Sequence, residues 1–230
     1  MTASFKVANR DREPFTYTVT VDALSSSGAV ESNVKVTVPS VPPGQSVERT
    51  VQLHAARNPG QGAGSARISK VRRVPTAEAP DAAGPCPASG VRLTADDGDA
   101  AMGLRVVGLQ LINCGARPYT IKGYPLLQVL DENRKAVPGI KIFKGSGGVA
   151  TVDDFDVPAR RVALRSGQHA TAAFMWRNTT GLEGSAVNAP YVRVRGGVED
   201  PPVMFTPELD LGTTGKLGVS PWRIGEGGGR

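Results

Sequence analysis

The sequence has little of what most metal-dependent and membrane-spanning proteins are built from. Among 230 residues it has only two cysteines and two histidines, and aromatic residues make up 5%. No CxxC pair and no paired-histidine spacing predicts a zinc site. No run approaches the roughly 18 consecutive apolar residues of a membrane-spanning helix. These shortages favour a binding or structural role, and we expect no cofactor.

Familiar catalytic patterns are also missing. His54 and His169 lie in strand or turn contexts without a G-x-S-x-G elbow, so they do not indicate a serine or cysteine hydrolase. The glycines Gly145, Gly147 and Gly148 are not followed by the lysine and helix of a phosphate-binding loop. We therefore interpret the glycine-rich, acidic stretch from Lys144 to Asp156 as a mobile loop.

The charge is mildly basic, with 27 Lys and Arg against 21 Asp and Glu and a net charge of +6. Nucleic-acid sites combine clustered basic residues with stacking aromatics, which are scarce here, so we expect no nucleic-acid partner. The one basic cluster is Arg67, Lys70, Arg72 and Arg73. Two interpretations stay open, a solvated strand end or a contact for phosphates or anionic lipid headgroups.

Turn-forming residues, by contrast, are abundant. The chain has 28 glycines and 18 prolines spread along its length, which is typical of many short strands. Between residues 15 and 22, apolar residues occupy the odd positions and polar residues the even ones, as in a strand with one wet face. Similar runs recur along the chain. We predict an all-β protein of two tandem immunoglobulin-like β-sandwich domains.

A stretch rich in proline and alanine divides the chain. We predict a small sandwich at 1–75, a linker at 76–85, a second sandwich at 86–224 and a flexible tail at 225–230. Immunoglobulin-like domains usually have about 100 residues, and the first strand here begins at the recorded first residue. We therefore expect the first domain to be truncated at its N-terminus.

The two cysteines bear on the compartment. Cys86 precedes one predicted strand and Cys114 ends another, and a bridge between them would close a loop of 28 residues. Such a loop corresponds to roughly 3.5 kcal/mol of unfolded-chain entropy. An even cysteine count favours a disulfide and an extracellular or cell-envelope location. Two free thiols in a cytosolic protein are the alternative, and the absence of a signal peptide conflicts with export unless the recorded start lies downstream of one.

Two groups of side chains are candidate ligand sites. Carboxylates that are weak candidates for calcium are Asp96, Asp97, Asp99, Asp153, Asp154 and Asp156. The first group lacks the glutamate of an EF-hand, and turn chemistry also explains it. A candidate platform for a sugar or peptidoglycan consists of Tyr119, Tyr124, Trp176 and Arg177. Strand aromatics usually fill the core, so a buried Trp176 is the alternative.

Several separated motifs of the second half resemble a known family. They are Cys86, Asn113-Cys114-Gly115, Gly123-Tyr124-Pro125, Arg165-Ser166-Gly167 and Met175-Trp176-Arg177-Asn178-Thr179. They are similar to the actinobacterial domain of unknown function 4232 family of exported, often lipid-anchored envelope proteins, over residues 86 to about 224. The resemblance implies a β-sandwich, paired cysteines and no established catalytic residue, although many members carry the second cysteine nearer the position of Tyr119.

The first domain is loosely similar to small immunoglobulin-like modules of bacterial envelope proteins, through Val7-Ala8-Asn9 and Pro42-Pro43-Gly44-Gln45-Ser46. We therefore expect a non-enzymatic, exported cell-envelope protein used for binding or structural display, with a cell-wall glycan or an envelope protein as partner. Two alternatives stay open. One is an envelope carbohydrate-active hydrolase that uses the acidic residues 153–156, and the other is a cytosolic protein-binding adaptor.

Overall fold

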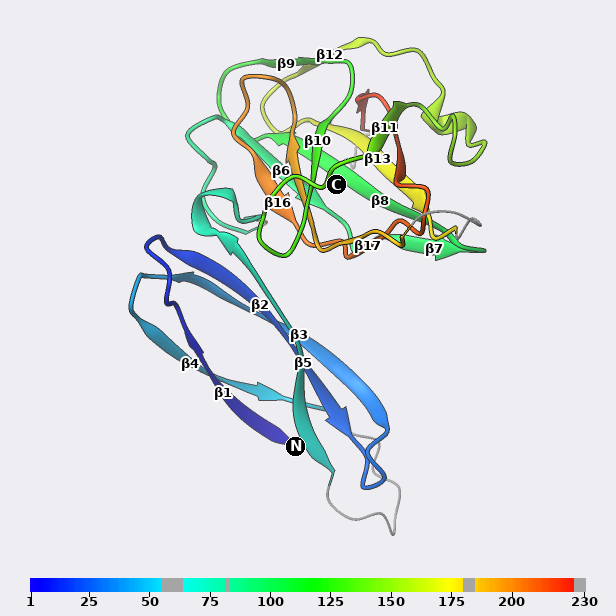
Figure 1. Ribbon diagram of the computed structural model, residues 1–230. Coiled ribbons are helices and arrows are strands. Elements are labelled where there is room, and N and C mark those ends of the chain that lie inside the picture. Colours follow the sequence, from blue (N-terminus) through cyan, green and yellow to red (C-terminus); the bar gives the residue numbers. More distant parts are fainter. Residues whose placement is uncertain (55–63, 82, 180–184, 226–230) are drawn as a thin grey trace. The chain divides into compact units, whose positions relative to one another are not determined.

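The computed structural model describes residues 1–54, 64–81, 83–179 and 185–225 (Figure 1). Within them the regular elements are strands and two short 3-10 helices, without an α-helix, so the prediction of an all-β chain is confirmed. The chain divides into two compact units, Met1–Ala79 and Pro80–Arg230, and the division lies inside the predicted linker. The predicted tail lies outside the described residues beyond Gly225.

The first unit consists of two antiparallel sheets that share one core (Figure 1). The elements of the smaller sheet are β1 (Thr2–Ala8) and β4 (Ser46–Gln52). In the larger sheet the order is β3 (Val30–Val41), β2 (Phe15–Leu24) and β5 (Ser65–Pro75). The odd residues of β2 from Phe15 to Ala23 are buried and share their core with Phe5 and Val7 of β1. The alternation in the sequence thus places the apolar face of β2 against the other sheet.

Strand β3 is longer than its prolines predict. The turn residues of 39–44 predict a break that begins at Pro39, but the strand continues to Val41 through a shift in its register with β2. Ser40 absorbs the irregularity with a φ of 45°, and its amide donates a hydrogen bond to Thr16 Oγ1 at 3.2 Å. A proline is tolerated here because β3 is an edge strand of its sheet.

The second unit is built around one large sheet with smaller sheets packed near it (Figure 1). The large sheet has the order β11 (Lys141–Lys144), β18 (Lys216–Val219), β13 (His169–Arg177), β8 (Leu104–Asn113) and β6 (Val91–Ala95), with β7 (Asp99–Ala101) on β8 and β19 (Arg223–Ile224) on β13. The smaller sheets are β10 (Leu126–Leu130) with β15 (Tyr191–Arg195) and β16 (Val203–Phe205), β9 (Tyr119–Lys122) with β12 (Arg161–Leu164), and β14 (Asn188–Ala189) with β17 (Leu209–Asp210).

Strand β13 runs through the middle of this unit. Its buried residues Phe174 and Trp176 stack with their ring centroids 5.9 Å apart, and Trp222 is buried in the same core. Large aromatic side chains contribute most of the apolar area that such a core removes from water. The second unit is therefore organised around residues that the sequence marks as its most apolar strand.

Two local predictions for this unit are wrong. The acidic stretch Asp96–Asp99 lies between two strand-like runs and predicts a hairpin turn. In the structure the turn lies at Met102 and Gly103, which have φ values of 47° and 78° and join β7 to β8. Positive φ at two successive residues matches the twist of a tight hairpin. The stretch from Lys144 to Asp156 is not a mobile loop, because Phe155 and Ser146 within it are buried.

A buried asparagine fixes the same corner in each unit. In the first unit, Asn9 Nδ2 donates to the carbonyl oxygens of Glu13 and Val41, both at 2.8 Å, and Oδ1 accepts from the amide of Asp11 at 2.9 Å. In the second unit, Asn113 Nδ2 donates to the carbonyl oxygens of Arg117 and Leu164, both at 2.9 Å, and Oδ1 accepts from the amide of Gly115 at 3.1 Å. We call this arrangement the asparagine corner.

The strands around the two corners correspond as well. β1 pairs with β4 as β8 pairs with β13, and β2 pairs with β3 as β9 pairs with β12. In the first pair of strands, Ala8 lies opposite Ser46 as Ile112 lies opposite His169 in the second unit. In the other pair of strands, Phe15 lies opposite Val41 as Tyr119 lies opposite Leu164. In both segments the asparagine is followed by four residues, a proline, an aromatic residue and a threonine. The two units therefore share a four-strand framework that the sequence analysis did not recognise.

Candidate functional site

A disulfide joins Cys86 to Cys114, with the sulfur atoms 2.03 Å apart and the Cα atoms 5.6 Å apart. Cys114 directly follows Asn113, the last residue of β8, and the asparagine corner fixes its position. Cys86 lies in the segment that leads into β6. Because β6 pairs with β8, with Val91 opposite Asn113, the bridge closes the end of this strand pair.

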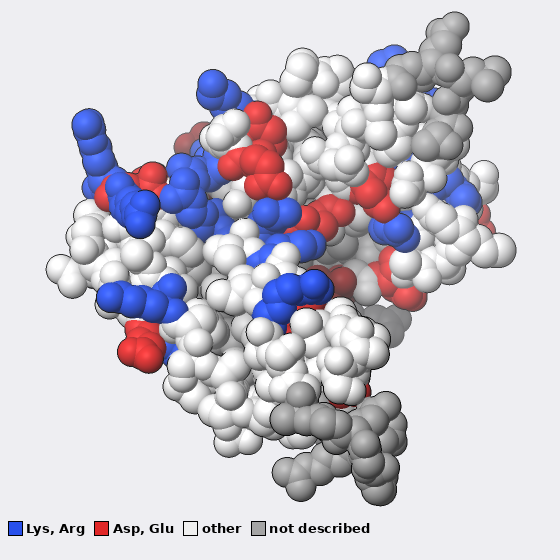
Figure 2. Space-filling view, turned by 60° about the horizontal axis from the view of Figure 1, so that its bottom comes forward, with Lys and Arg blue, Asp and Glu red and all other residues white. Residues whose placement is uncertain are grey.

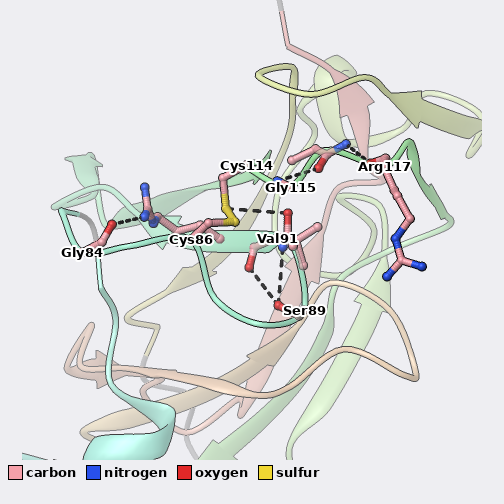
Figure 3. Close-up of a disulfide and its surroundings, with 10 residues drawn as sticks. Gly84, Cys86, Ser89, Val91, Cys114, Gly115 and Arg117 are labelled. Carbon is pink, nitrogen blue, oxygen red and sulfur yellow. Dashed lines mark hydrogen bonds between the residues drawn. A yellow bond between two sulfur atoms is a disulfide. The ribbon is translucent and has the colours of Figure 1, made fainter.

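Glycines and arginines lie around the bridge (Figure 3). The amide of Gly115 donates to the carbonyl oxygen of Gly90 at 2.9 Å, and a side chain at Gly115 would bring a Cβ within 3.0 Å of the Gly90 Cα. The guanidinium of Arg92 donates to the carbonyl oxygen of Gly84. Figure 3 shows the Arg117 side chain directed away from the sulfur atoms. Cys86 itself is exposed.

The structure does not bring the candidate platform residues together. Trp176 is only 2% exposed and donates from Nε1 to Asp210 at 2.7 Å, so the prediction that it contributes to a surface platform is wrong. A large aromatic side chain in the central strand stabilises the fold by removing a large apolar area from water when it packs in the core. Arg177 lies at the end of β13 that pairs with Leu104, whereas Tyr119 follows the opposite end of β8.

Tyr119 and Tyr124 are both partly buried. The Tyr119 hydroxyl donates to the carboxylate of Asp200, which also accepts from the amide of Gly197 at 2.6 Å. Burial, reinforced by this hydrogen bond and by the charge of Asp200, raises the pKa of Tyr119 above its ordinary value. Lys144 Nζ lies 5.6 Å from the ring centroid of Tyr124. These contacts tie loops of the second unit together.

Asp210 holds a polar cluster that the sequence analysis missed. Its carboxylate accepts two bonds from Arg105 Nε and one from Arg105 Nη2 at 2.7 Å, and Asn178 donates to it at 3.1 Å. Burial acts to raise the pKa of Asp210, but the hydrogen bonds from Arg105 and Trp176 and the charge of Arg105 outweigh it and hold that pKa below its usual range. The sequence places Asp210 between Leu209 and Leu211, and the structure buries both leucines.

The weak calcium candidates act in turns. Asp96 Oδ1 accepts from the amides of Gly98 and Gly108, both at 2.9 Å, and a side chain at Gly108 would clash with the Asp96 carboxylate. Asp156 accepts from the amide of Ser146 at 2.8 Å and from its hydroxyl. The carboxylate of Asp99 accepts a hydrogen bond from the amide of Ala100, and that of Asp154 accepts one from Arg223. Within the ranges described above, no three His, Cys, Asp or Glu side chains are grouped to hold a metal ion.

The basic cluster of the first unit is divided between two faces of the larger sheet. Arg67, Lys70 and Arg72 lie opposite the outward-facing residues of β2, whereas Arg73 pairs with Tyr17 on the inward face. Arg67 forms an ion pair with Asp22 at 3.2 Å. On the face drawn in Figure 2, Lys and Arg side chains lie next to Asp and Glu rather than forming one separate basic area.

Comparison with protein families places most of the second unit in a family. A family model described as "Domain of unknown function (DUF4232)" matches residues 86–223, which include both cysteines and the asparagine corner of the second unit. No curated protein matches the chain. Of the helices in the described part, none has the length and apolar character to cross a membrane.

Proposed function

The chain belongs to the DUF4232 family, and from this premise and the disulfide we propose that it acts outside the cytoplasm as a non-enzymatic binding or display module of the cell envelope. The bridge between Cys86 and Cys114 is the observation that carries the proposal. Disulfides persist in oxidising compartments and are rare where thioredoxin and glutathione keep thiols reduced.

The proposal includes two tandem immunoglobulin-like sandwiches. Each unit has a pair of strands that ends at an asparagine corner, and in the first unit two facing sheets share one core. Sandwiches of this kind present loops and strand edges on a rigid framework and commonly serve recognition. A cell-wall glycan or an envelope protein is the partner class that fits this compartment.

A binding role is supported by what the acidic residues do. The carboxylate of Asp156 accepts a hydrogen bond from the amide of Ser146, and that of Asp154 accepts one from Arg223, so both already have partners within the chain. A general acid needs an environment that raises its pKa toward neutrality. The hydrogen bonds from Ser146 instead lower the pKa of Asp156.

The thiol state in the producing cells tests the proposal. Protein isolated from the envelope or culture fluid without reductant should react with an alkylating agent only after reduction, as measured by mass spectrometry. A variant with both Cys86→Ser and Cys114→Ser is the control for non-specific labelling. If both thiols react before reduction, and the protein stays with the cytosolic fraction, the main argument for export is lost and the cytosolic adaptor takes its place.

A further inference from the structure

Strand β1 has an edge that is open in the described part of the chain, because its one strand partner there is β4. Met1 and Leu53 exchange hydrogen bonds at 2.8 Å, and the amide of Asn9 donates to Gln45 at 2.9 Å. Backbone groups of an antiparallel strand alternate in direction, so the odd residues of β1 bond to β4. The amides and carbonyls that face the open edge are those of Thr2, Ser4, Lys6 and Ala8.

The equivalent edge of the second unit is occupied. β8 corresponds to β1, and β6 pairs with β8 on the side away from β13. The residues of β8 that correspond to Asn9, Val7 and Phe5 face, in order, Val91, Leu93 and Ala95 of β6. Val91 and Leu93 are only 6% and 7% exposed, so β6 completes the core with apolar side chains at alternate positions.

The core of the first unit is incomplete below the same edge. Ile68 and Val71 of β5 pair with the buried residues Val21 and Val19, yet they are 48% and 47% exposed. Ser32 Oγ of β3 donates to the carbonyl oxygen of His54, two residues after β4, at 2.6 Å, which places β4 over β3. Phe5 and Val7 of β1 share a core with β2, so β1 lies over β2. A strand added to the open edge of β1 would then lie over β5 and cover these two side chains.

We propose that the open edge of β1 binds an extended segment of a partner protein, which pairs antiparallel to β1 as β6 pairs with β8. Addition of a strand to a sheet edge is an established mode of peptide recognition, in which backbone hydrogen bonds give affinity and alternate side chains give specificity. The segment has apolar residues opposite Phe5, Val7 and Asn9, and polar residues between them.

The charge of Lys6 favours one type of residue at one position of the partner segment. Lys6 faces outward in the middle of β1, with Glu48 opposite it on β4. The partner residue on the other side of Lys6 corresponds to Thr94 of β6. Opposite charges on neighbouring strands attract, so an acidic residue is favoured at that position. The segment is therefore amphipathic, apolar toward the core and acidic beside Lys6.

A synthetic peptide with the sequence of residues 89–96, which contains β6, serves as the probe. Peptide at saturation should slow hydrogen exchange at the amides of Lys6 and Ser4 by about tenfold or more, because these groups gain partners. The amides of Phe5 and Val7, already bonded to β4, should change little. A peptide with Leu93→Asp is the matched control and should give no protection, because a charge would enter the core.

Two variants of the full chain locate the binding site. Lys6→Pro removes an amide that points to the open edge while sparing the bonds to β4, and it should weaken peptide binding about tenfold, whereas Lys6→Ala should weaken it less than about threefold. Val71→Glu changes an exposed residue and should also weaken binding about tenfold, which tests the site even if the proline variant does not fold.

Three results would overturn the proposal. Equal binding by the wild type, Lys6→Pro and Val71→Glu would place the peptide elsewhere, for example in exchange with β6. Protection of the Lys6 amide that rises with protein concentration without peptide would mean that a second copy occupies the edge. Protection without peptide at every concentration would mean that the chain itself already covers it. Because the thiol state is measured separately, none of these results depends on export.

Discussion

Asn113→Ala should destabilise the second unit more than most single substitutions do. The side chain is 1% exposed and makes three hydrogen bonds, two from Nδ2 to the carbonyl oxygens of Arg117 and Leu164 and one to Oδ1 from the amide of Gly115. Alanine removes all three and leaves the Leu164 carbonyl oxygen buried without this donor. At about 1 kcal/mol for each bond, the expected loss is about 3 kcal/mol.

This loss should appear as a lower unfolding temperature. For a unit of this size, 1 kcal/mol corresponds to roughly 2–4 °C, so the midpoint should fall by about 6–12 °C. Both tryptophans, Trp176 and Trp222, belong to the second unit, and both are buried. Tryptophan fluorescence during thermal unfolding therefore reports on the second unit alone.

The first unit supplies the matched control. Asn9→Ala removes the equivalent three bonds, two to the carbonyl oxygens of Glu13 and Val41 and one from the amide of Asp11. It should lower the stability of the first unit by a similar amount, as measured by hydrogen exchange in β1. The tryptophan-detected midpoint should not move. A change below about 1 kcal/mol for Asn113→Ala would refute the role assigned to the corner. A tryptophan midpoint that moves equally in both variants would refute the independence of the two units.

Two further predictions concern ionisation. Asp210→Asn should cost about 1–2 kcal/mol through the weakened bonds to Arg105. Because the folded pKa of Asp210 is depressed, the wild type should lose this stability as the pH falls from about 4 through the folded pKa, and the variant should show a flatter curve in acid unfolding. The pKa of Tyr119 is raised in the folded state, so the wild type should lose stability as the pH rises above about 10. The stability of Tyr119→Phe should depend less on pH in that range. The difference in tyrosinate absorbance between the two proteins should develop above that pH.

The sequence was sufficient for the strands that alternate clearly. The alternating run 15–22 predicts a strand with one apolar face, and the structure buries that face in β2. The apolar run 170–177 predicts another strand, which the structure contains as β13. The division between the units also follows from composition, because the proline-rich stretch has no apolar period. The position of Cys114 at the end of a predicted strand was enough to favour the bridge that the structure contains.

Features that depend on contacts between distant residues were not predictable from local pattern. Lys216–Val219 pairs in parallel with Lys141–Lys144 and lies beside β13, a pairing between residues about 75 apart that no local pattern indicates. The asparagine corner needs Asn113 and Leu164, which are 51 residues apart. Trp176 was a candidate surface residue because the alternation of side chains along a strand does not show which face another sheet will cover.

The equivalent strand edge is covered in the second unit and open in the described part of the first, and the disulfide lies beside the covered edge. In the second unit, β6 covers the edge of β8, and Cys86–Cys114 ties the start of β6 to the residue that follows β8. In the first unit the residue equivalent to Cys114 is Arg10, and β1 pairs only with β4 within the described residues. A covalent link removes chain entropy from the state in which the edge strand has detached, so β6 is held in place while the edge of β1 is left to non-covalent pairing. β6 thus covers this edge in the second unit, whereas the described part of the first unit leaves the edge of β1 open to the partner segment that we propose.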